Sequence, residues 1–485
     1  MVAFSVTSLV VLTLTLCHAI NIEELLDSLS LEEKVGQMTQ LDLDMFVNNS
    51  SGEIDWVNVT DWFNTYKFGS MFNSPFSNGQ IDGKVGWNAT EWRSIMNKLQ
   101  TIAQDSKSKI PILYALDSIH GATFVYGAAL FPQAINVAAS FDPEIAYSSG
   151  QITGKDTRAA GVPWLFSPVL GLGLNPLWAR FPETFGEDSY LTSTLGTALI
   201  HGIQNSGEQY PGVPARAAAC MKHFIAYSDP YNGHDRSPVM LPDRVLRQLY
   251  VPAFKAAVDA GVLTAMESYQ EVGGVPMASS SEYLKKLLRL ELNFTGLLVT
   301  DYHEIENLYE WHRVAPSVSD AVQLAMEGTS IDMSMVATDS SFTTDLIALV
   351  QEGSVDMERV DESVRRVLEL KDALGLFDDP VPSTDDTSLT ATVGSAHDYD
   401  LSLNASRASI TLLKNRNNSL LPIPEGSAVG VGGPTCDSLA SQLNGWSFHW
   451  QGPLDNAEFQ QGVTMLQGIQ QLSTGSVSCV WYRNV

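Results

Sequence analysis

Asp301 is the residue whose position most directly suggests chemistry. It follows the short, mostly apolar run from Gly296 to Thr300, and the aromatic Tyr302 comes directly after it. A run of this length and composition predicts a strand buried on both faces, as parallel sheets contain. The end of such a strand holds a carboxylate rigidly, which is what a nucleophile requires. We therefore predict that Asp301 is a catalytic nucleophile.

Other apolar runs along the chain also end in polar residues that are able to bind or react. They are 112–116 before Asp117, 164–166 before Ser167, 217–221 before Lys222 and His223, and 262–266 before Glu267 and Tyr269. Helical periodicity follows several of these runs, which predicts an α/β fold with alternating strands and helices. A doubly wound sheet would gather functional residues at one switch point. Because they are spread over many strand ends, we predict a (β/α)₈ TIM-like barrel.

The rest of the chain predicts a second, smaller unit. A helix is expected at 357–374, with Gly375 as its C-cap, and a linker rich in Pro, Asp, Ser and Thr follows. Strands are expected at 408–413 and 428–431. We predict a signal peptide at 1–19, a barrel domain at 20–378, a linker at 379–404 and an incomplete α/β sandwich domain at 405–485.

Composition limits the class of partner. The 485 residues are 44% hydrophobic and 17% charged, which is typical of a globular protein. The formal net charge of −27 argues against nucleic acids and anionic membranes, because both require clustered Lys and Arg. After the leader, no stretch approaches the ~18 unbroken apolar residues of a spanning helix. We therefore expect neither a nucleic-acid partner nor a membrane anchor.

Two features predict passage through the secretory pathway. The segment from Met1 to Ala19 has an apolar core and ends in a small residue, as a signal peptide does. Glycosylation sequons occur at Asn48, Asn49, Asn58, Asn88, Asn293, Asn404 and Asn417. We predict a secreted glycoprotein, with the lumen of a lysosome or vacuole as the alternative location.

The few cysteines of the mature chain do not form a disulfide framework. Cys436 and Cys479 are able to pair within the C-terminal region, whereas Cys220 lies in an apolar run and is expected to be a buried thiol. No metal-ligand spacing is present. We expect neither a metal nor a cofactor.

Several motifs in order along the chain resemble glycoside hydrolase family 3. They are 31–38 (LEEKVGQM), 116–121 (LDSIHG), 131–132 (FP), 175–180 (NPLWAR), 183–188 (ETFGED), 221–224 (MKHF) and 299–302 (VTDY). Each motif is weak alone, but together they cover nearly the whole mature chain. The resemblance is strongest to the lysosomal-type or secreted β-glucosidases and the exo-β-glucanases of this family.

The resemblance assigns roles residue by residue. Asp301 matches the family nucleophile, which forms a covalent glycosyl-enzyme intermediate in a retaining glycosidase. Residues that hold the sugar in the −1 subsite are matched by Asp117, Arg180, Lys222 and His223. A carboxylate accepts hydrogen bonds from sugar hydroxyls, and Lys, Arg and His donate to them. Alternatively, Arg180 pairs with Glu183 or Glu187, and the Lys222-His223 pair is structural.

Aromatic residues are expected to line the same subsites. Tyr269 matches a family tyrosine near the nucleophile, and Tyr302 occupies a position that is often Trp in exo-glucanases. Trp446 and Trp450 resemble the second-domain loop that stacks on the sugar at the +1 subsite, since indole rings pack well on sugar faces. Glu267 is left with two interpretations, as a ligand for the sugar or as one half of a salt bridge.

The expected general acid/base is apparently absent. In the family it is a second-domain glutamate roughly 200 residues after the nucleophile, and the printed sequence ends sooner than that. A branch of the family uses an Asp-x-His pair instead. The corresponding loop here contains His234-Asp235-Arg236, in which the two residues are reversed and adjacent, so we expect Asp235 and Arg236 to position the loop or contact the sugar.

Together these features predict a retaining exo-β-glucosidase that releases terminal β-D-glucosyl residues from β-glucosides or β-glucans. Two alternatives remain open. One is a non-catalytic glycan-binding protein that kept the −1 subsite. The other is a β-N-acetylglucosaminidase or β-xylosidase of the same family.

Overall fold

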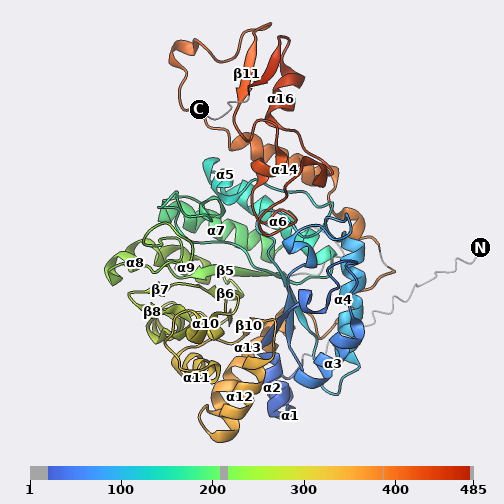
Figure 1. Ribbon diagram of the computed structural model, residues 1–485, viewed down its shortest axis with the longest axis vertical. Coiled ribbons are helices and arrows are strands. Elements are labelled where there is room, and N and C mark those ends of the chain that lie inside the picture. Colours follow the sequence, from blue (N-terminus) through green and yellow to red (C-terminus); the bar gives the residue numbers. More distant parts are fainter. Residues whose placement is uncertain (1–19, 208–216, 386, 481–485) are drawn as a thin grey trace, which may run out of the picture.

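The structure is a computed structural model that describes residues 20–207, 217–385 and 387–480. Its centre is an eight-stranded parallel sheet in the order β10-β1-β2-β3-β4-β5-β6-β9. The strands are β1 (Thr39–Asp42), β2 (Ser70–Phe72), β3 (Leu113–Leu116), β4 (Trp164–Leu165), β5 (Ala218–Phe224), β6 (Thr264–Glu267), β9 (Leu297–Val299) and β10 (Ser334–Ala337). Figure 1 shows these strands surrounded by helices.

The sheet closes into a barrel where β9 meets β10. Val299 pairs with Met333 in a parallel bridge, and the Thr300 N–H donates to the Met333 carbonyl at 3.0 Å. The predicted TIM-like barrel is therefore confirmed. The predicted strands that end before Asp117, Ser167, Lys222, Glu267 and Asp301 correspond to β3, β4, β5, β6 and β9.

Helices cover the outside of the barrel. They are α1 (Ile22–Ser28), α2 (Leu31–Gln37), α3 (Trp56–Tyr66), α4 (Ala89–Gln104), α5 (Ala134–Ala139), α6 (Pro143–Ala159), α7 (Ser189–Gln204), α8 (Asp243–Leu249), α9 (Val251–Asp259), the π-helix η5 (Glu282–Glu291), α10 (Glu304–Glu310), α11 (Val318–Gly328), α12 (Ser341–Glu352) and α13 (Met357–Ala373). A short antiparallel hairpin, β7 (Glu271–Val272) with β8 (Val275–Pro276), follows β6.

Strand alternation divides the core into two layers. Leu113 and Ala115 of β3 belong to the cluster that fills the barrel, together with Cys220. Tyr114 and Leu116 belong to the larger cluster between strands and helices. Successive side chains of a strand point to opposite faces, so one short strand supplies both layers. Cys220 is a buried free thiol, as the sequence predicts.

The helix predicted at 357–374 is confirmed as α13, and Gly375 after it adopts φ +71°. Glycine tolerates this left-handed conformation without steric cost, which suits it to end a helix. The strand predicted at 408–413 is wrong, because residues 396–408 form α14 (Ala396–Ala408) and residues 409–413 form no strand. Ile410 and Leu413 are 79% and 90% exposed, with no neighbouring strand to bury them.

The C-terminal segment stands to one side of the barrel, beyond α14 (Figure 1). It contains two parallel strands, β11 (Val429–Gly432) and β12 (Val477–Val480), with α15 (Leu439–Leu443) and α16 (Met465–Leu472). The domain boundaries expected from the sequence stay a prediction.

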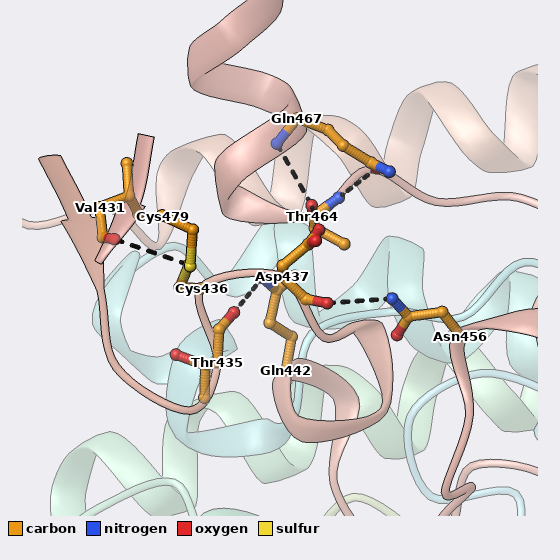
Figure 2. The surroundings of a disulfide bond; sticks show 9 residues. All are labelled: Val431, Thr435, Cys436, Asp437, Gln442, Asn456, Thr464, Gln467 and Cys479. Atoms are coloured by element: carbon orange, nitrogen blue, oxygen red, sulfur yellow. Dashed lines mark hydrogen bonds between the residues drawn. A yellow bond between two sulfur atoms is a disulfide. The ribbon is translucent and has the colours of Figure 1, made fainter. Parts of the chain in front are cut away.

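Cys436 and Cys479 form a disulfide across the C-terminal segment, with Cα atoms 7.0 Å apart. Figure 2 shows the polar contacts beside it. The Thr464 hydroxyl donates to Asp437 Oδ1 at 2.7 Å, and the Asn456 side chain donates to the Asp437 carbonyl at 3.0 Å. These bonds connect the turn after β11 to the start of α16.

A buried ion pair joins α14 to the barrel. Lys155 of α6 contacts Asp156 at 2.7 Å and Asp398 of α14 at 3.0 Å. Its ammonium also donates to the Thr392 carbonyl at 2.8 Å. These bonds fix the segment from which the chain returns towards the barrel mouth.

Among the helices within the described residues, none is long and apolar enough to cross a membrane.

A second buried charge cluster supports the closure of the barrel. Asp332, at the start of β10, is fully buried and accepts from Arg289 at 2.7 Å, from Arg366 at 2.8 Å and from the Leu298 N–H at 2.9 Å. One carboxylate thus bonds η5, α13 and the backbone of β9. Removing one member of such a cluster leaves buried charge uncompensated.

We expect Asp332→Asn to lower the free energy of unfolding by about 3–5 kcal/mol, because Arg289 loses its anion and Arg366 keeps only its pair with Glu362. Urea denaturation measures this loss. The matched control is Asp259→Asn, which breaks a solvent-exposed pair with Lys255 and should cost less than about 1 kcal/mol. Equal losses in the two variants would contradict a special role for Asp332.

Candidate active site

A cavity of about 660 Å³ opens at the C-terminal ends of the barrel strands. All eight site residues predicted from the sequence line it: Asp117, Arg180, Lys222, His223, Tyr269, Asp301, Tyr302 and Trp446. Seven of them come from the barrel, and Trp446 comes from the C-terminal segment. The connections that carry functional residues in a TIM barrel all meet at this face.

Asp301 lies just after β9 and is only 6% exposed. Its Oδ1 accepts the Tyr302 N–H at 2.8 Å, and its Oδ2 lies 3.4 Å from His223 Nε2. Burial raises the pKa of the Asp301 carboxyl above its ordinary value, while Arg180, Tyr269 and Lys222 oppose this change. Among the described residues, Oδ2 has no partner with good hydrogen-bond geometry.

A buried ion pair lies at the base of the cavity. Lys222 of β5 donates to Asp117 Oδ1 at 2.6 Å, with the two side chains 2% and 13% exposed. Asp117 follows β3, so two strand ends position the pair. Ammonium and carboxylate together offer donors and acceptors in a fixed arrangement, which suits the vicinal hydroxyls of a sugar.

Arg180 makes the structural pairing that the sequence left open. Its Nε and Nη2 donate to Glu183 at 2.9 and 2.8 Å, while Nη1 lies 3.1 Å from His223 Nε2. A guanidinium group held by two parallel bonds is fixed in orientation. Burial and the cations around His223, first Arg180 and then Lys222, hold the pKa of its imidazole well below the usual value. His223 is therefore neutral.

Aromatic side chains form the walls of the cavity. Tyr302 packs edge-on against Phe72, with ring centroids 6.1 Å apart. The Trp446 ring lies 5.6 Å from Lys222 Nζ and 5.9 Å from the Arg180 guanidinium carbon, and Trp450 lines the same cavity. Ring faces next to a polar floor suit a sugar, which has apolar faces and polar edges.

Hydrogen bonds dock the loop that carries Trp446 onto the barrel. Gln133 donates to the Leu443 and Gly445 carbonyls, each at 2.9 Å. The Ser447 hydroxyl lies 3.1 Å from His120 Nε2, and the Trp450 N–H donates to the Ser77 carbonyl at 2.8 Å. The loop that carries Trp446 and Trp450 is therefore fixed to the barrel by hydrogen bonds.

The loop after β5 contributes Asp235 and Arg236, as expected. Asp235 accepts from the Trp178 indole at 2.8 Å, and the Arg236 guanidinium stacks over Tyr269 at 3.8 Å. Both residues line the cavity. His234 is exposed and lies outside the lining.

A pair of carboxyl groups that also lines the cavity was not predicted from the sequence. Asp42 ends β1, and Asp44 follows two residues later. Burial raises the pKa of Asp42 to about 6 and, with the neighbouring Asp42 charge, that of Asp44 to about 8. The sequence feature that could have revealed this pair is the aspartate at the end of a strand. The run Thr39–Asp42 is, however, too polar to be recognised as a buried strand.

Glu267 fits neither interpretation offered from the sequence. It is fully buried, lies outside the cavity lining and forms no ion pair with a described residue. Its Oε1 accepts the backbone N–H of Asp301 at 3.1 Å. Among the described cavity residues, no carboxylate comes from the segment after residue 404. The expectation that the general acid/base is absent stays a prediction.

Comparisons with known proteins agree with this geometry. The lysosomal beta glucosidase of Dictyostelium discoideum is 41% identical over 458 residues, which are 93% of this chain and 55% of that protein. A periplasmic beta-glucosidase of Salmonella typhimurium is 31% identical over 395 residues, which are 80% of this chain and 49% of that protein. The chain thus spans about half the length of these curated relatives.

A solved structure shares the fold and most of the length. A glutamine-to-alanine mutant of an exo-1,3/1,4-beta-glucanase from a Pseudoalteromonas species superposes with a TM-score of 0.82 and 26% sequence identity, covering 96% of this chain and 73% of that one. The family described as "Glycosyl hydrolase family 3 N terminal domain" matches residues 30–370, which span the barrel and most of α13. The chain therefore belongs to glycosyl hydrolase family 3.

Proposed function

We propose that the protein is a retaining exo-β-glucosidase that removes terminal β-D-glucosyl residues from β-glucosides or β-glucans. The observation that carries the proposal is the environment of Asp301. One buried carboxylate oxygen is held by a backbone N–H, and the other lies among Arg180, His223 and Lys222 without a hydrogen-bond partner among the described residues. An oxygen in this setting is suited to attack an anomeric carbon.

In this mechanism Asp301 forms the covalent glycosyl-enzyme intermediate. Lys222, Asp117 and Arg180 bind the hydroxyls of the terminal sugar. Hydrogen bonds that strengthen as the oxocarbenium-like transition state forms lower the barrier, and do more than improve binding. Neutral His223 lies 3.4 Å from Asp301 Oδ2 through Nε2, which faces the Arg180 guanidinium, and it adds no positive charge that would pair with the nucleophile.

Glucose as the sugar follows from the relatives, whose names describe β-glucosidases and an exo-1,3/1,4-β-glucanase. The leader at 1–19 and the lysosomal and periplasmic locations in the relatives' names support a secreted or lumenal protein. The leader lies outside the described residues. The negative net charge is compatible with a neutral sugar substrate, because no charge attraction is needed for its binding.

Asp301→Asn should abolish turnover, because an amide is a poor nucleophile. We expect hydrolysis of an activated aryl β-glucoside to fall at least about 10³-fold. A fluorinated glucoside inactivator should label Asp301 in the wild type, as measured by peptide mass. Aryl glucosides with good leaving groups are chosen because they need little help from a proton donor.

The control for this variant is Asp372→Asn, an exposed aspartate on α13. Aryl xyloside and aryl N-acetylglucosaminide, assayed under the same conditions, separate the alternative specificities. Saturable glucose binding without turnover of any aryl glycoside would instead identify a glycan-binding protein. A label on any other residue would contradict the assignment of Asp301.

Arg180→Gln should move the acid limb of the pH profile upwards. Arg180 is the strongest of the groups that lower the pKa of Asp301, and the carboxylate must be ionised to react. Without this cation its pKa rises, so activity appears only at higher pH. The pH dependence of kcat/KM measures the shift, with the exposed Arg244→Gln as control. An unmoved limb would show that another group sets it.

Trp446→Ala should weaken binding more than chemistry, because the ring lines the cavity and carries no group that takes part in bond cleavage. We expect KM for a glucan oligosaccharide to rise about 2- to 10-fold, which corresponds to the loss of one stacked ring. Steady-state kinetics measure kcat and KM separately. The exposed Trp311→Ala serves as control. A large loss of kcat at unchanged KM would place Trp446 in the chemical step instead.

A further inference from the structure

Glu267 is a buried carboxyl group that the proposed mechanism does not use. It ends β6, is 0% exposed, and accepts the Asp301 backbone N–H through Oε1. Its other oxygen, Oε2, is also buried and has no hydrogen-bond partner among the described residues. An ionised carboxylate in such a place would lack both water and a counter-charge, which is very costly.

The groups around Glu267 are mostly acidic. Glu304 of α10 is 2% exposed, accepts from Asn307 at 2.7 Å, and has its own Oε2 buried 3.9 Å from His312 Nε2. His312 in turn contacts Glu271 of the β7–β8 hairpin at 3.0 Å. Other charged groups on the packed elements include Lys222 of β5, Asp301 after β9, Glu306 and Glu310 of α10, and Arg236 on the loop after β5, which interacts with Asp301 and Glu304.

We propose that Glu267 is a neutral positioning residue for Asp301, which holds the nucleophile's backbone through Oε1 while Oε2 carries a proton. The proposal rests on the proposed role of Asp301 as the nucleophile. The two oxygens of a protonated carboxyl group differ. The carbonyl oxygen accepts the backbone N–H, and the protonated oxygen adds no negative charge near Glu304 and Asp301.

The electrostatics of the site support this protonation state. Burial, followed by the charges of Glu304 and Asp301, raises the pKa of Glu267 well above its ordinary value. Burial lowers the pKa of His312, but its contacts with Glu304 and Glu271 outweigh this and raise it, so the imidazole interacts with those carboxylates rather than with Glu267. A neutral Glu267 leaves Asp301 with fewer negative neighbours, and Asp301 therefore ionises at lower pH.

Glu267→Gln tests the protonation state through activity. Glutamine is neutral at every pH, and its side-chain oxygen is still able to accept the Asp301 N–H. We expect kcat/KM at pH 5 to stay within about threefold of wild type. A decline at alkaline pH that comes from ionisation of Glu267 should disappear in this variant, because the amide has no proton to lose. A loss greater than about tenfold at pH 5 in the folded variant would overturn the proposal.

Glu306→Gln is the matched control for the activity measurements on Glu267→Gln. Glu306 lies on the same helix as Glu304, is 4% exposed, and has a pKa that burial raises to about 8. Asp301 is not among the groups that shift it. This variant should therefore leave the pH profile of activity unchanged. An equal shift of the alkaline limb in both variants would overturn the specific link between Glu267 and Asp301.

Stability provides a test that needs no turnover. In the unfolded chain Glu267 ionises above its ordinary pKa of 4.5, whereas the native protein keeps the proton. Its contribution to stability is therefore complete below pH 4.5 and is lost as the pH rises. The test uses the ratio of the unfolding equilibrium constant of the wild type to that of Glu267→Gln. This ratio should grow about tenfold per pH unit between pH 5 and pH 7. Urea titrations at several pH values measure it.

The stability arm separates the two proposals. If no glycoside is hydrolysed but the ratio rises with pH, the proposed function fails and the neutral state of Glu267 stands. If turnover is normal but the ratio is flat, the present inference is overturned and the enzyme assignment stands.

Glu267→Met tests whether the hydrogen bond from the Asp301 backbone N–H to Glu267 positions the nucleophile. Methionine fills similar volume but leaves the Asp301 N–H without an acceptor. We expect kcat to fall about 10- to 100-fold with little change in KM, because the nucleophile is less well aligned. The glutamine variant should retain the activity that methionine loses. Equal activity of the methionine variant and wild type would contradict a positioning role, and if methionine prevents folding, the glutamine arm decides alone.

Discussion

The closure of β9 against β10 is the constraint on which the rest of the structure depends. This seam ends at Thr300, whose N–H bonds to Met333, and the next residue is Asp301. Beneath the seam, the Asp332 carboxylate bonds the β9 backbone and two arginines from neighbouring helices. The position of the proposed nucleophile is therefore set by barrel closure at one end of β9 and by buried charges at the other. A loop without these supports would not hold a carboxylate in one orientation.

The sequence predicts those strands whose residues are apolar on both faces. Leu297 to Val299 and Leu113 to Leu116 stand out because neither face of these strands meets water. The strands β1 and β2 are hidden because they bury polar side chains, as where Gln40 donates to Ser70 at 2.8 Å. Such a pair satisfies its own hydrogen bonds inside the protein. Composition alone cannot show that, since the partner is 30 residues away in sequence.

The error at 408–413 has the opposite cause. Ile410, Leu412 and Leu413 are as apolar as a buried strand, but a strand also needs a neighbour to pair with. Pattern indicates which residues favour burial, and the neighbours decide whether burial occurs. The site shows the same division. Strand ends predicted which side chains would meet, whereas the backbone bond of Glu267 depends on a contact between two strands that no spacing reveals.

Trp446 reaches the cavity from a segment that is separate from the barrel in sequence. Its loop rests on the barrel through Gln133, His120 and the carbonyl of Ser77. The floor of the cavity, by contrast, is made by strand ends that also hold the barrel together. If the protein acts as proposed, substitutions in the loop alter how saccharides fit the cavity and leave the strand ends of its floor unchanged. Under the proposed function, the range of substrates can change in evolution without a change in the residues that cleave the bond. The loop is therefore the segment in which to redesign substrate range while keeping bond cleavage.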